Sequence, residues 1–352
     1  MKSVIRIPFL MGGAALAFLL NYELSQHYFA FPEEEEDGIE AAMEQERQLT
    51  EDPTLHRIPK ERLLPAAEYR TQRVQTAEMM NLPVSGLNWT ERGPSNIGGR
   101  TRAILFDLND APNYRKIWAG GVGGGLWYTN DITVSAPQWN KVNDLLDNLA
   151  ISCIAQSSVT KNVLYFGTGE GWYNSDAQQG LGIWKSSDGG ASWSQLASTN
   201  NSIFYYVQKM VVDDQNNVFA CTRSGGVQKS SDGGATWTKV LGSGVNGGVH
   251  NAAADIELAP NGDLYCSLGI LNTGKIYRSA DRGVTWTDIS PATLSAQRIE
   301  LATSAGLSDV LYALAQGSGS YDCNSIQRYQ VSTNTWTNCS VPTIIDQGSN
   351  SP

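Results

Sequence analysis

Charged and aromatic side chains that could bind a ligand gather in three loop-like segments of the sequence. The six candidates are Arg100, Glu170, Trp172, Tyr173, Asp176 and His250. Four of them fall in one segment, GTGEGWYNSDAQQGLG, at residues 167–182. Aromatic rings beside carboxylates, an arginine and amides suit the binding of a sugar or a peptide. A structural alternative stays open, in which Arg100 and Glu170 form an ion pair between two sheets and the loop aromatics are solvated.

A second set of residues recurs three times, in KSSDGGASWSQL from Lys185, KSSDGGATWTKV from Lys229 and RSADRGVTWTDI from Arg278. The shared pattern is Ser-x-Asp-x-Gly-x-Thr/Ser-Trp. Its members are Ser186, Asp188, Gly190, Trp193, Ser230, Asp232, Gly234, Trp237, Ser279, Asp281, Gly283 and Trp286. A catalytic group is needed once and not once per repeat, which favours a structural role.

The residue types of this pattern explain such a role. An aspartate carboxylate can accept hydrogen bonds from the free N–H groups of a tight turn. Glycine adopts the positive φ of such a turn, and tryptophan buries a large area between neighbouring sheets. Each copy has one acid and lacks the alternating acids of a calcium loop. We therefore interpret the three copies as structural turns that bind no metal.

The three turns belong to a longer periodic pattern of strands. One aromatic residue recurs at steps of 47, 54, 46 and 47 residues, at Trp118, Tyr165, Phe219, Tyr265 and Tyr312. A tryptophan begins a short strand at Trp139, Trp193, Trp237, Trp286 and Trp336. Each unit thus holds about four short strands in roughly 45–50 residues, the size of a propeller blade. We predict an all-β protein, a β-propeller with at least five four-stranded blades that form part of a six- to eight-bladed or larger ring.

The order of the strands decides where each motif lies. We name the four strands of a unit A to D, as in ISCIAQS, VLYFG, GIWKS and SWSQL of the second unit. Because antiparallel strands alternate in direction, the C–D turns share one rim with the A–B turns. The B–C loops and the D-to-A connections share the opposite rim, where all six ligand candidates fall. Such loops commonly carry function, so this B–C rim is the predicted ligand-binding rim.

The repeated pattern resembles the Asp-box, also called the bacterial neuraminidase repeat, over roughly residues 87–340. The stretch WTERGPSNIGGRTRAILFDLND…KIWAGGVGGGLW is similar to the propeller domain of sortilin-like exported proteins, many of which carry a C-terminal sorting domain for type IX secretion. The same propeller type occurs in the xyloglucanase family and in a photosystem II assembly factor. Trp89 is typical of a D strand without preceding A to C strands, so we expect a longer protein with further blades.

The resemblance also allows two enzyme activities to be checked against this sequence. The xyloglucanase family places a catalytic Asp where AGGVGGG stands here, and the matching residue is Val122, which cannot transfer a proton. Sialidases need an arginine cluster, a tyrosine nucleophile and a Phe/Tyr-Arg-Ile-Pro segment. The only similar segment, HRIP at His56, precedes the propeller. We therefore favour an exported propeller that binds carbohydrate or protein without catalysis. A glycoside hydrolase and a secretion or assembly accessory protein are the alternatives.

The N-terminal part of the sequence predicts export. Lys2 and Arg6 precede the apolar run IPFLMGGAALAFLL, which is shorter than a bilayer span. We predict a signal peptide or signal anchor at 1–24, an acidic leader at 25–86 and the propeller at 87–352. The expected location is extracellular, at the cell surface or periplasmic. The net charge of −10 without a basic cluster argues against nucleic-acid binding.

The sequence contains five cysteines and three histidines. Cys153, Cys221 and Cys266 lie in apolar strand-like runs and are expected to be buried thiols. Cys323 and Cys339 bracket one hairpin and are predicted to form a disulfide in an exported protein. The three histidines lack metal-ligand spacing, so we expect no metal and no cofactor. The expected partner is a glycan or protein ligand at the cell surface, with membrane contact only through an uncleaved N-terminal anchor.

Overall fold

The computed structural model describes residues 47–48, 51–57, 59–63, 65–66, 68–70, 72–73, 100–143, 146–174, 177–317 and 323–341. The chain divides into two compact units, residues 1–63 and 64–352. The first contains the short 3₁₀ helix η1 (Lys60–Arg62) and an exposed ion pair of 2.7 Å between Arg57 and Glu61. The predicted signal at 1–24 and the predicted boundary at residue 87 lie outside the described residues. No helix among the described residues is long and apolar enough to cross a membrane.

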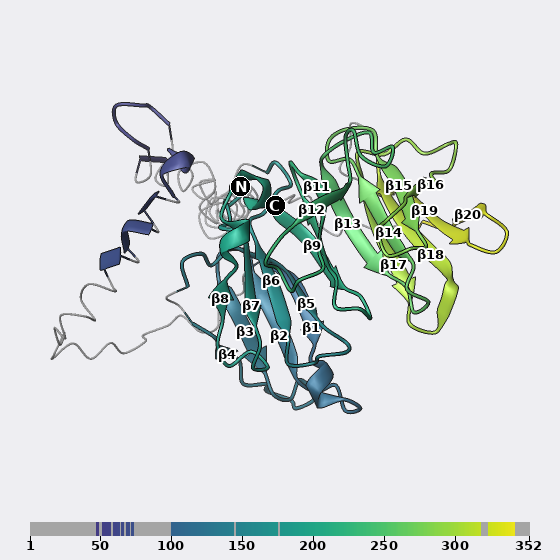
Figure 1. The fold of residues 1–352 in the computed structure, drawn as a ribbon. Helices are drawn as coiled ribbons and strands as arrows, with labels where there is room; N and C mark the ends of the chain where they lie inside the picture. The colour runs from purple at the N-terminus through teal and green to yellow at the C-terminus, as the bar shows by residue number, and fades with distance from the viewer. Residues whose placement is uncertain are drawn as a thin grey trace, which may run out of the picture. The chain divides into compact units, whose positions relative to one another are not determined.

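The second unit contains five four-stranded antiparallel sheets, each a meander in chain order (Figure 1). Blade 1 consists of β1 (Thr101–Phe106), β2 (Ile117–Gly121), β3 (Gly125–Thr129) and β4 (Asn140–Lys141). Blade 2 consists of β5 (Ile151–Gln156), β6 (Leu164–Thr168), β7 (Ile183–Ser186) and β8 (Ser194–Gln195). Blade 3 consists of β9 (Val207–Val212), β10 (Val218–Thr222), β11 (Gly226–Ser230) and β12 (Thr238–Leu241).

Blade 4 consists of β13 (Ala253–Leu258), β14 (Leu264–Leu268), β15 (Lys275–Ser279) and β16 (Thr287–Asp288). Blade 5 consists of β17 (Arg298–Ser304), β18 (Leu307–Gln316), β19 (Cys323–Gln330) and β20 (Thr335–Cys339). Three further 3₁₀ helices lie in connections: η2 (Leu108–Asp110), η3 (Ala197–Thr199) and η4 (Ser202–Phe204). The predicted all-β architecture of four-stranded propeller blades is confirmed.

The position of each strand in its blade explains its composition. All five residues are buried in each of the B strands β6, β10 and β14. These strands have a neighbouring strand on either side and packed faces above and below, so their sequences are mostly apolar. The D strands β4 and β16 are two exposed residues long, as suits the free edge of a sheet.

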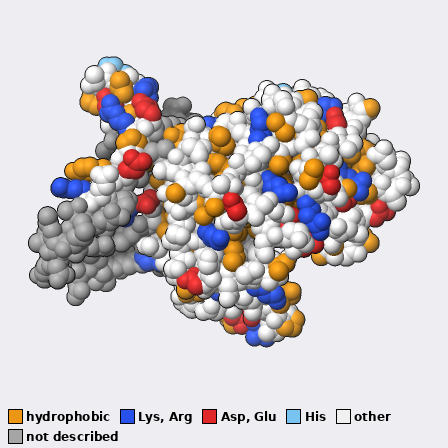
Figure 2. Space-filling model, in the orientation of Figure 1, with side chains coloured by type: hydrophobic (Ala, Val, Ile, Leu, Met, Phe, Trp, Pro, Cys, Tyr) orange, Lys and Arg blue, Asp and Glu red, His pale blue; other side chains and the backbone are white. Residues whose placement is uncertain are grey.

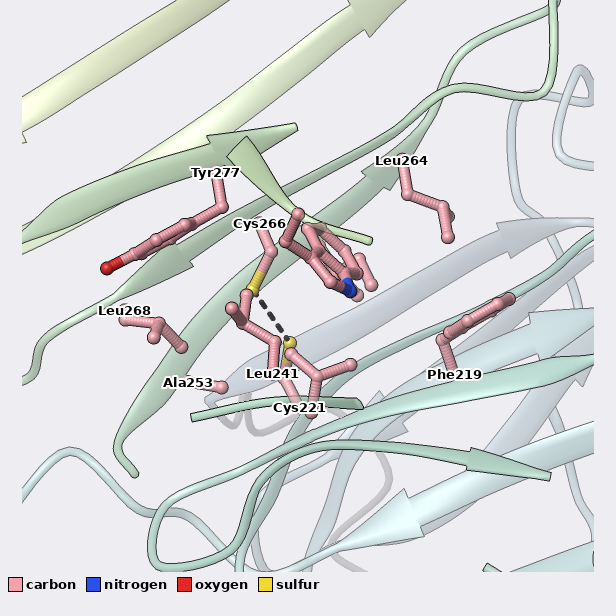
Figure 3. Packing of buried hydrophobic residues seen from close by; sticks show 11 residues of the cluster. Phe219, Cys221, Leu241, Ala253, Leu264, Cys266, Leu268 and Tyr277 are labelled. Atoms are coloured by element: carbon pink, nitrogen blue, oxygen red, sulfur yellow. Dashed lines mark hydrogen bonds between the residues drawn. The ribbon is translucent and has the colours of Figure 1, made fainter. Parts of the chain in front are cut away.

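The hydrophobic cores lie between consecutive blades and not within single sheets. One cluster joins Phe219, Cys221 and Leu241 of blade 3 to Cys266 and Tyr277 of blade 4 (Figure 3). Equivalent clusters join blade 2 to blade 3 and blade 4 to blade 5. A four-stranded sheet has two apolar faces, and each of these clusters covers one face with the next blade.

The recurring aromatic residue of the B strands is buried wherever another blade follows it in the chain. It is at most 2% exposed in blades 1 to 4, where it is Trp118, Tyr165, Phe219 and Tyr265. In blade 5 it is Tyr312, which is 40% exposed. Blades 1 to 4 each have a following blade that packs over this residue, whereas no sheet of the described residues follows blade 5.

The predicted disulfide of blade 5 is wrong, because both Cys323 and Cys339 are free thiols. In the hairpin of β19 and β20, Cys339 lies opposite Ile326 and not opposite Cys323. On the other side of β19, Cys323 pairs with Gln316 next to a register shift in β18. The predicted burial of Cys153, Cys221 and Cys266 is confirmed, and the sulfur atoms of Cys221 and Cys266 are 3.9 Å apart.

Candidate functional site

The three repeated turns form what we call the box hairpins, residues 186–193, 230–237 and 279–286. They lie on the rim of the A–B turns. In blade 2 the Gly189 N–H donates to the Asn162 carbonyl of the A–B turn, at 2.9 Å. In blade 4 Arg282 pairs with Asp214 of the A–B turn in blade 3, at 3.0 Å. The five ligand candidates that the structure describes lie on B–C loops or just before A strands, so the box hairpins are remote from them.

Each box hairpin satisfies its own polar groups in the same way. In the second one, the Ser230 hydroxyl donates to the Asp232 carboxylate at 2.8 Å and accepts from the Gly234 N–H at 2.8 Å. The Asp232 carboxylate also accepts from the N–H and hydroxyl of Thr236, at 2.9 and 2.6 Å. Gly234 has a φ of 98°, which favours glycine at that position. Each of these carboxylates therefore accepts hydrogen bonds from its own hairpin.

The box tryptophans lie between blades. Trp193 of blade 2 contacts Trp118 of blade 1, with ring centroids 6.1 Å apart. Trp237 contacts Phe204 at 5.3 Å, and Trp286 belongs to the core between blades 3 and 4. The box lysines were not among the sequence predictions, although they also link blades. Lys185 donates to the Gly233 carbonyl of the next box hairpin at 2.9 Å, and Lys229 makes the equivalent bond.

A cavity of about 510 Å³ opens on the B–C rim. Its lining comes from four blades: Arg102 on β1, Trp172 after β6, Leu271 after β14, and Arg298 and Glu300 on β17. A smaller cavity of about 170 Å³ between the A strands shares most of these residues and adds Lys209 and Asp255. In Figure 2, basic and acidic side chains are interspersed on the visible face. The cavity of about 510 Å³ places opposite charges beside apolar walls and is the candidate site.

Glu170 ties the first two blades together beneath this cavity. Its carboxylate pairs with Arg100, accepts from Nε and Nη2 of Arg102 at 3.0 and 2.7 Å, and accepts from the amide of Asn174 at 2.9 Å. The side chain is only 1% exposed. Both carboxylate oxygens are therefore engaged by donors and shielded from solvent. Arg100 and Glu170 thus form an ion pair between two blades, as the structural alternative predicted.

Trp172 contacts residues of three other blades. The guanidinium carbon of Arg298 in blade 5 lies 3.4 Å from its ring centroid, and that of Arg102 in blade 1 lies 5.8 Å away. The indole also packs against Ala252 and Ile270 of blade 4. Trp172 therefore lines the cavity, but its ring is used for contacts with three other blades.

Two described candidates, Tyr173 and His250, are not brought to the cavity. Tyr173 is exposed, has a φ of 64° and stacks on Arg223, whose guanidinium carbon is 4.7 Å from the ring centroid. His250 is partly buried in the connection before β13 and does not line the cavity. Asp176 lies outside the described residues. Of the six candidates, Arg100 and Trp172 line the cavity and Glu170 supports it.

A charged cluster extends this site between the A strands. The Asp255 carboxylate accepts from the Leu301 N–H of blade 5 at 2.8 Å and lies 3.3 Å from the ammonium group of Lys209 in blade 3. Burial raises the pKa of Asp255 to about 7, the charges of Glu300 and Glu257 add to the rise, and Lys209 opposes it. Among the described residues, no three His, Cys, Asp or Glu side chains are placed to hold a metal ion.

Several cavity residues were missed by the sequence predictions. Arg102 could have been found, because it follows Arg100 by two residues, the spacing that places strand residues on one face. Arg298 and Glu300 show the same alternation at the start of β17. Their proximity to Trp172 depends on the curvature of the blade array, which no local pattern reveals.

Comparison with known proteins supports the fold. A GH74 enzyme of Niastella koreensis is similar with a TM-score of 0.50 and 23% identity, over 68% of this chain and 37% of that one. The GH74 xyloglucanase of Xanthomonas campestris gives 0.52 and 18%, over 71% and 39%. The extracellular domain of a B. thetaiotaomicron protein described as a hybrid two-component system gives 0.51 and 14%, over 71% and 32%.

No family model and no curated protein sequence matches the chain. The chain spans less than two fifths of the length of each of these three solved structures. At such identities the likeness concerns the arrangement of the backbone and not the chemistry of any site. The chain is therefore an all-β protein built from β-propeller blades.

Proposed function

We propose that the chain is an exported β-propeller that binds a ligand in the cavity on the B–C rim and catalyses no reaction there. The observation that carries this proposal is the state of Glu170, which is buried and bonded through both oxygens to Arg100, Arg102 and Asn174. A general acid or base must reach the reacting atoms. A carboxylate surrounded by donors in this way supports a structural role for Glu170.

A second carboxylate is also missing where hydrolase chemistry would use one. Retaining and inverting glycosidases generally need two carboxyl groups facing the scissile bond. At the position where the xyloglucanase resemblance implies an Asp, Val122 is buried and its N–H donates to the Arg100 carbonyl at 2.9 Å. This arrangement favours binding over glycoside hydrolysis, which stays the alternative function.

The cavity itself suits a ligand. Its volume of about 510 Å³ falls within the roughly 300–1,000 Å³ typical of small-molecule and cofactor sites. Ile270 and Leu271 provide apolar walls, and Arg102, Arg298 and Glu300 provide a few polar groups for orientation. Export is supported by the basic and apolar run of the first 24 residues. The Asp-box and sortilin-like resemblance, with its link to type IX secretion, is consistent with an extracellular or cell-surface role.

Filling the cavity tests this proposal. Leu271 is 51% exposed in the cavity wall, so Leu271→Trp should obstruct the cavity without disturbing a core. Val284→Trp, at a position 65% exposed on the box rim, is the matched control. On arrays of glycans and peptides, the protein and the control should retain the same ligands, whereas Leu271→Trp should lose them.

The alternative function has its own measurement. The protein should release no reducing sugar from xyloglucan or β-glucans. Turnover that is abolished by Glu170→Gln would instead establish a glycoside hydrolase. Array binding that is unaffected by Leu271→Trp would place the ligand elsewhere on the molecule.

A further inference from the structure

Two buried cysteines face each other between blades 3 and 4. Cys221 lies two residues after Phe219 on β10, and side chains at that spacing point to the same face of a strand, here toward blade 4. Cys266 directly follows Tyr265 on β14, whose ring packs toward blade 5, so this thiol points to the opposite face, toward blade 3. Figure 3 shows the two sulfur atoms directed at each other, 3.9 Å apart. The alternation of side chains along two strands thus places both thiols in one interface.

The surroundings of this thiol pair are apolar and closed to solvent. Cys221 and Cys266 are both 0% exposed, and Leu241, Leu268 and Trp286 belong to the same core cluster. A buried disulfide between two packed sheets, with a tryptophan beside it, is the arrangement of immunoglobulin domains. A disulfide needs sulfur atoms about 2.05 Å apart, so side-chain rotations that share a movement of roughly 2 Å close this pair. The interface between the two blades can therefore hold a covalent link.

We propose that Cys221 and Cys266 form a disulfide that joins blade 3 covalently to blade 4 in the exported protein. The inference goes beyond the ligand-binding function and uses only the export part of that proposal, because exported proteins meet an oxidising environment. Unlike Cys323 and Cys339, which the register of their hairpin separates, these two thiols are already in contact.

The link forms by two steps of thiol–disulfide exchange with an external disulfide, such as oxidised glutathione or the disulfide of a thiol oxidase. The thiolate of one cysteine attacks a sulfur atom of this oxidant, forms a mixed disulfide and releases the other sulfur of the oxidant as a thiolate. The thiolate of the second cysteine then attacks the protein sulfur of the mixed disulfide and expels the remaining thiolate. Cys221 and Cys266 each lose one proton, and their two electrons reduce the oxidant to two thiols.

Burial decides when this exchange takes place. Burial raises the pKa of the Cys221 thiol well above its usual range, so the folded protein presents little reactive thiolate. The exchange therefore takes place during folding, before blade 4 covers Cys221. The ends of the closed loop are 45 residues apart in the chain, so the link restricts the unfolded chain and stabilises the assembled blades.

Refolding of the full chain tests the proposal. The protein is reduced in denaturant and refolded in a mixture of reduced and oxidised glutathione. Its remaining thiols are then alkylated in denaturant, and the peptides are mapped by mass spectrometry. A link between Cys221 and Cys266 should be present in most molecules. Cys221→Ala and Cys266→Ala should each abolish it, whereas the matched control Cys153→Ala, which removes a buried thiol between blades 2 and 3, should retain it.

The linked and the reduced forms of the unaltered chain give a second measurement, which needs no substitution. The linked form should unfold at a urea concentration about 1 M higher than the reduced form, because the link restricts the unfolded chain. The link should survive a reductant that is added to the folded protein, since the two sulfur atoms are buried. The same reductant should remove the link in urea.

Three outcomes would overturn the proposal. Alkylated Cys221 and Cys266 in a chain that has completed refolding would show that the interface keeps the two thiols apart. A main link from either of them to Cys153, Cys323 or Cys339 would assign a different pair. A linked form that unfolds at no higher urea concentration than the reduced form would mean that the link strains the contact between the blades. None of these results alters the ligand arrays, so a failure of this inference can be told apart from a failure of the proposed function.

Discussion

The two rims of the propeller use their carboxylates in different ways. On the box rim, Asp188, Asp232 and Asp281 each bond to the Ser and Ser/Thr of their own hairpin with nearly identical distances. On the B–C rim and along the A strands, Glu170 and Asp255 bond to other blades. A group that is satisfied locally can be repeated in every blade. A carboxylate whose hydrogen-bond partners lie in another blade, such as that of Glu170 or Asp255, occurs once and forms its bonds only when the blades are assembled. The cavity lies beside these carboxylates.

The two kinds of carboxylate also respond differently to protons. Hydrogen bonds from the hydroxyl and N–H of Ser192 lower the pKa of Asp188 to about 2. Burial raises the pKa of Asp255 to about 7. The folded state thus favours the charged form of the first and the neutral form of the second. Local satisfaction stabilises charge, whereas burial between blades penalises it.

The largest effect should come from the contact between blades. Glu170→Ala leaves Arg100 and Arg102 without their shared partner, and we expect a loss of about 2–4 kcal/mol in the free energy of unfolding, reduced from the fully buried case because both arginines are partly exposed. Urea denaturation of the full chain measures this loss. Glu61→Ala removes the exposed pair with Arg57 and should barely move the midpoint. Similar urea midpoints for Glu170→Ala and Glu61→Ala would mean that the buried contact between blades stabilises the fold no more than an exposed ion pair does.

A smaller effect is expected within one box hairpin. Ser279 is buried, and Ser279→Ala leaves the Gly283 N–H without its acceptor at 2.8 Å. The expected loss is about 1–2 kcal/mol. Ser186→Ala and Ser230→Ala should give the same loss within error, because the three hairpins have the same bonds. Thermal unfolding compares the three variants, and a clear outlier would show that one box has a further role.

The smallest change in the free energy of unfolding at neutral pH is expected when a single carboxylate is neutralised, as in Asp188→Asn or Asp255→Asn. The pH dependence of this change should differ between the box rim and the A strands. The advantage of wild type over Asp188→Asn should be full above pH 4 and decline as pH falls toward 2, because the folded pKa lies below the ordinary value. For Asp255→Asn the sign is opposite. Wild type should lose stability relative to this variant as pH rises from about 4 to 7, because the unfolded state releases its proton first.

Stability measured across pH 2–8 checks both slopes. Parallel curves for the two variants would refute the contrast between local and inter-blade carboxylates. A flat difference for Asp255→Asn alone would mean that Lys209 holds Asp255 ionised throughout.

The fold was accessible from the sequence because its signals are local. The aromatic repeat predicted the B strands, and ISCIAQS, the segment named as an A strand, contains β5. Alternation of strand direction was enough to place Arg100 and Glu170 on the same rim. Short-range periodicity and the antiparallel meander determine both results.

The site was accessible only in part, because it depends on contacts between distant segments. Trp172 was predicted to contact a ligand, but its neighbours include Arg298, which reaches it only through the arrangement of five blades. The disulfide of Cys323 and Cys339 failed because of the register of its hairpin. The turn between Gln330 and Thr335 places Cys339 opposite Ile326, so Cys323 lies three residues away from the position that faces Cys339.

The glycine of each box hairpin limits which substitutions and duplications of the repeats the fold can accept. Gly190 has a φ of 89°, and a β-carbon there would lie 2.3 Å from the Trp118 ring of the preceding blade. Gly283 stands in the same way against Phe219. A substitution in one repeat is therefore felt by its predecessor, and a duplicated repeat can be inserted only where that predecessor offers a matching surface. Each repeat must therefore stay compatible with the repeat that precedes it in the chain.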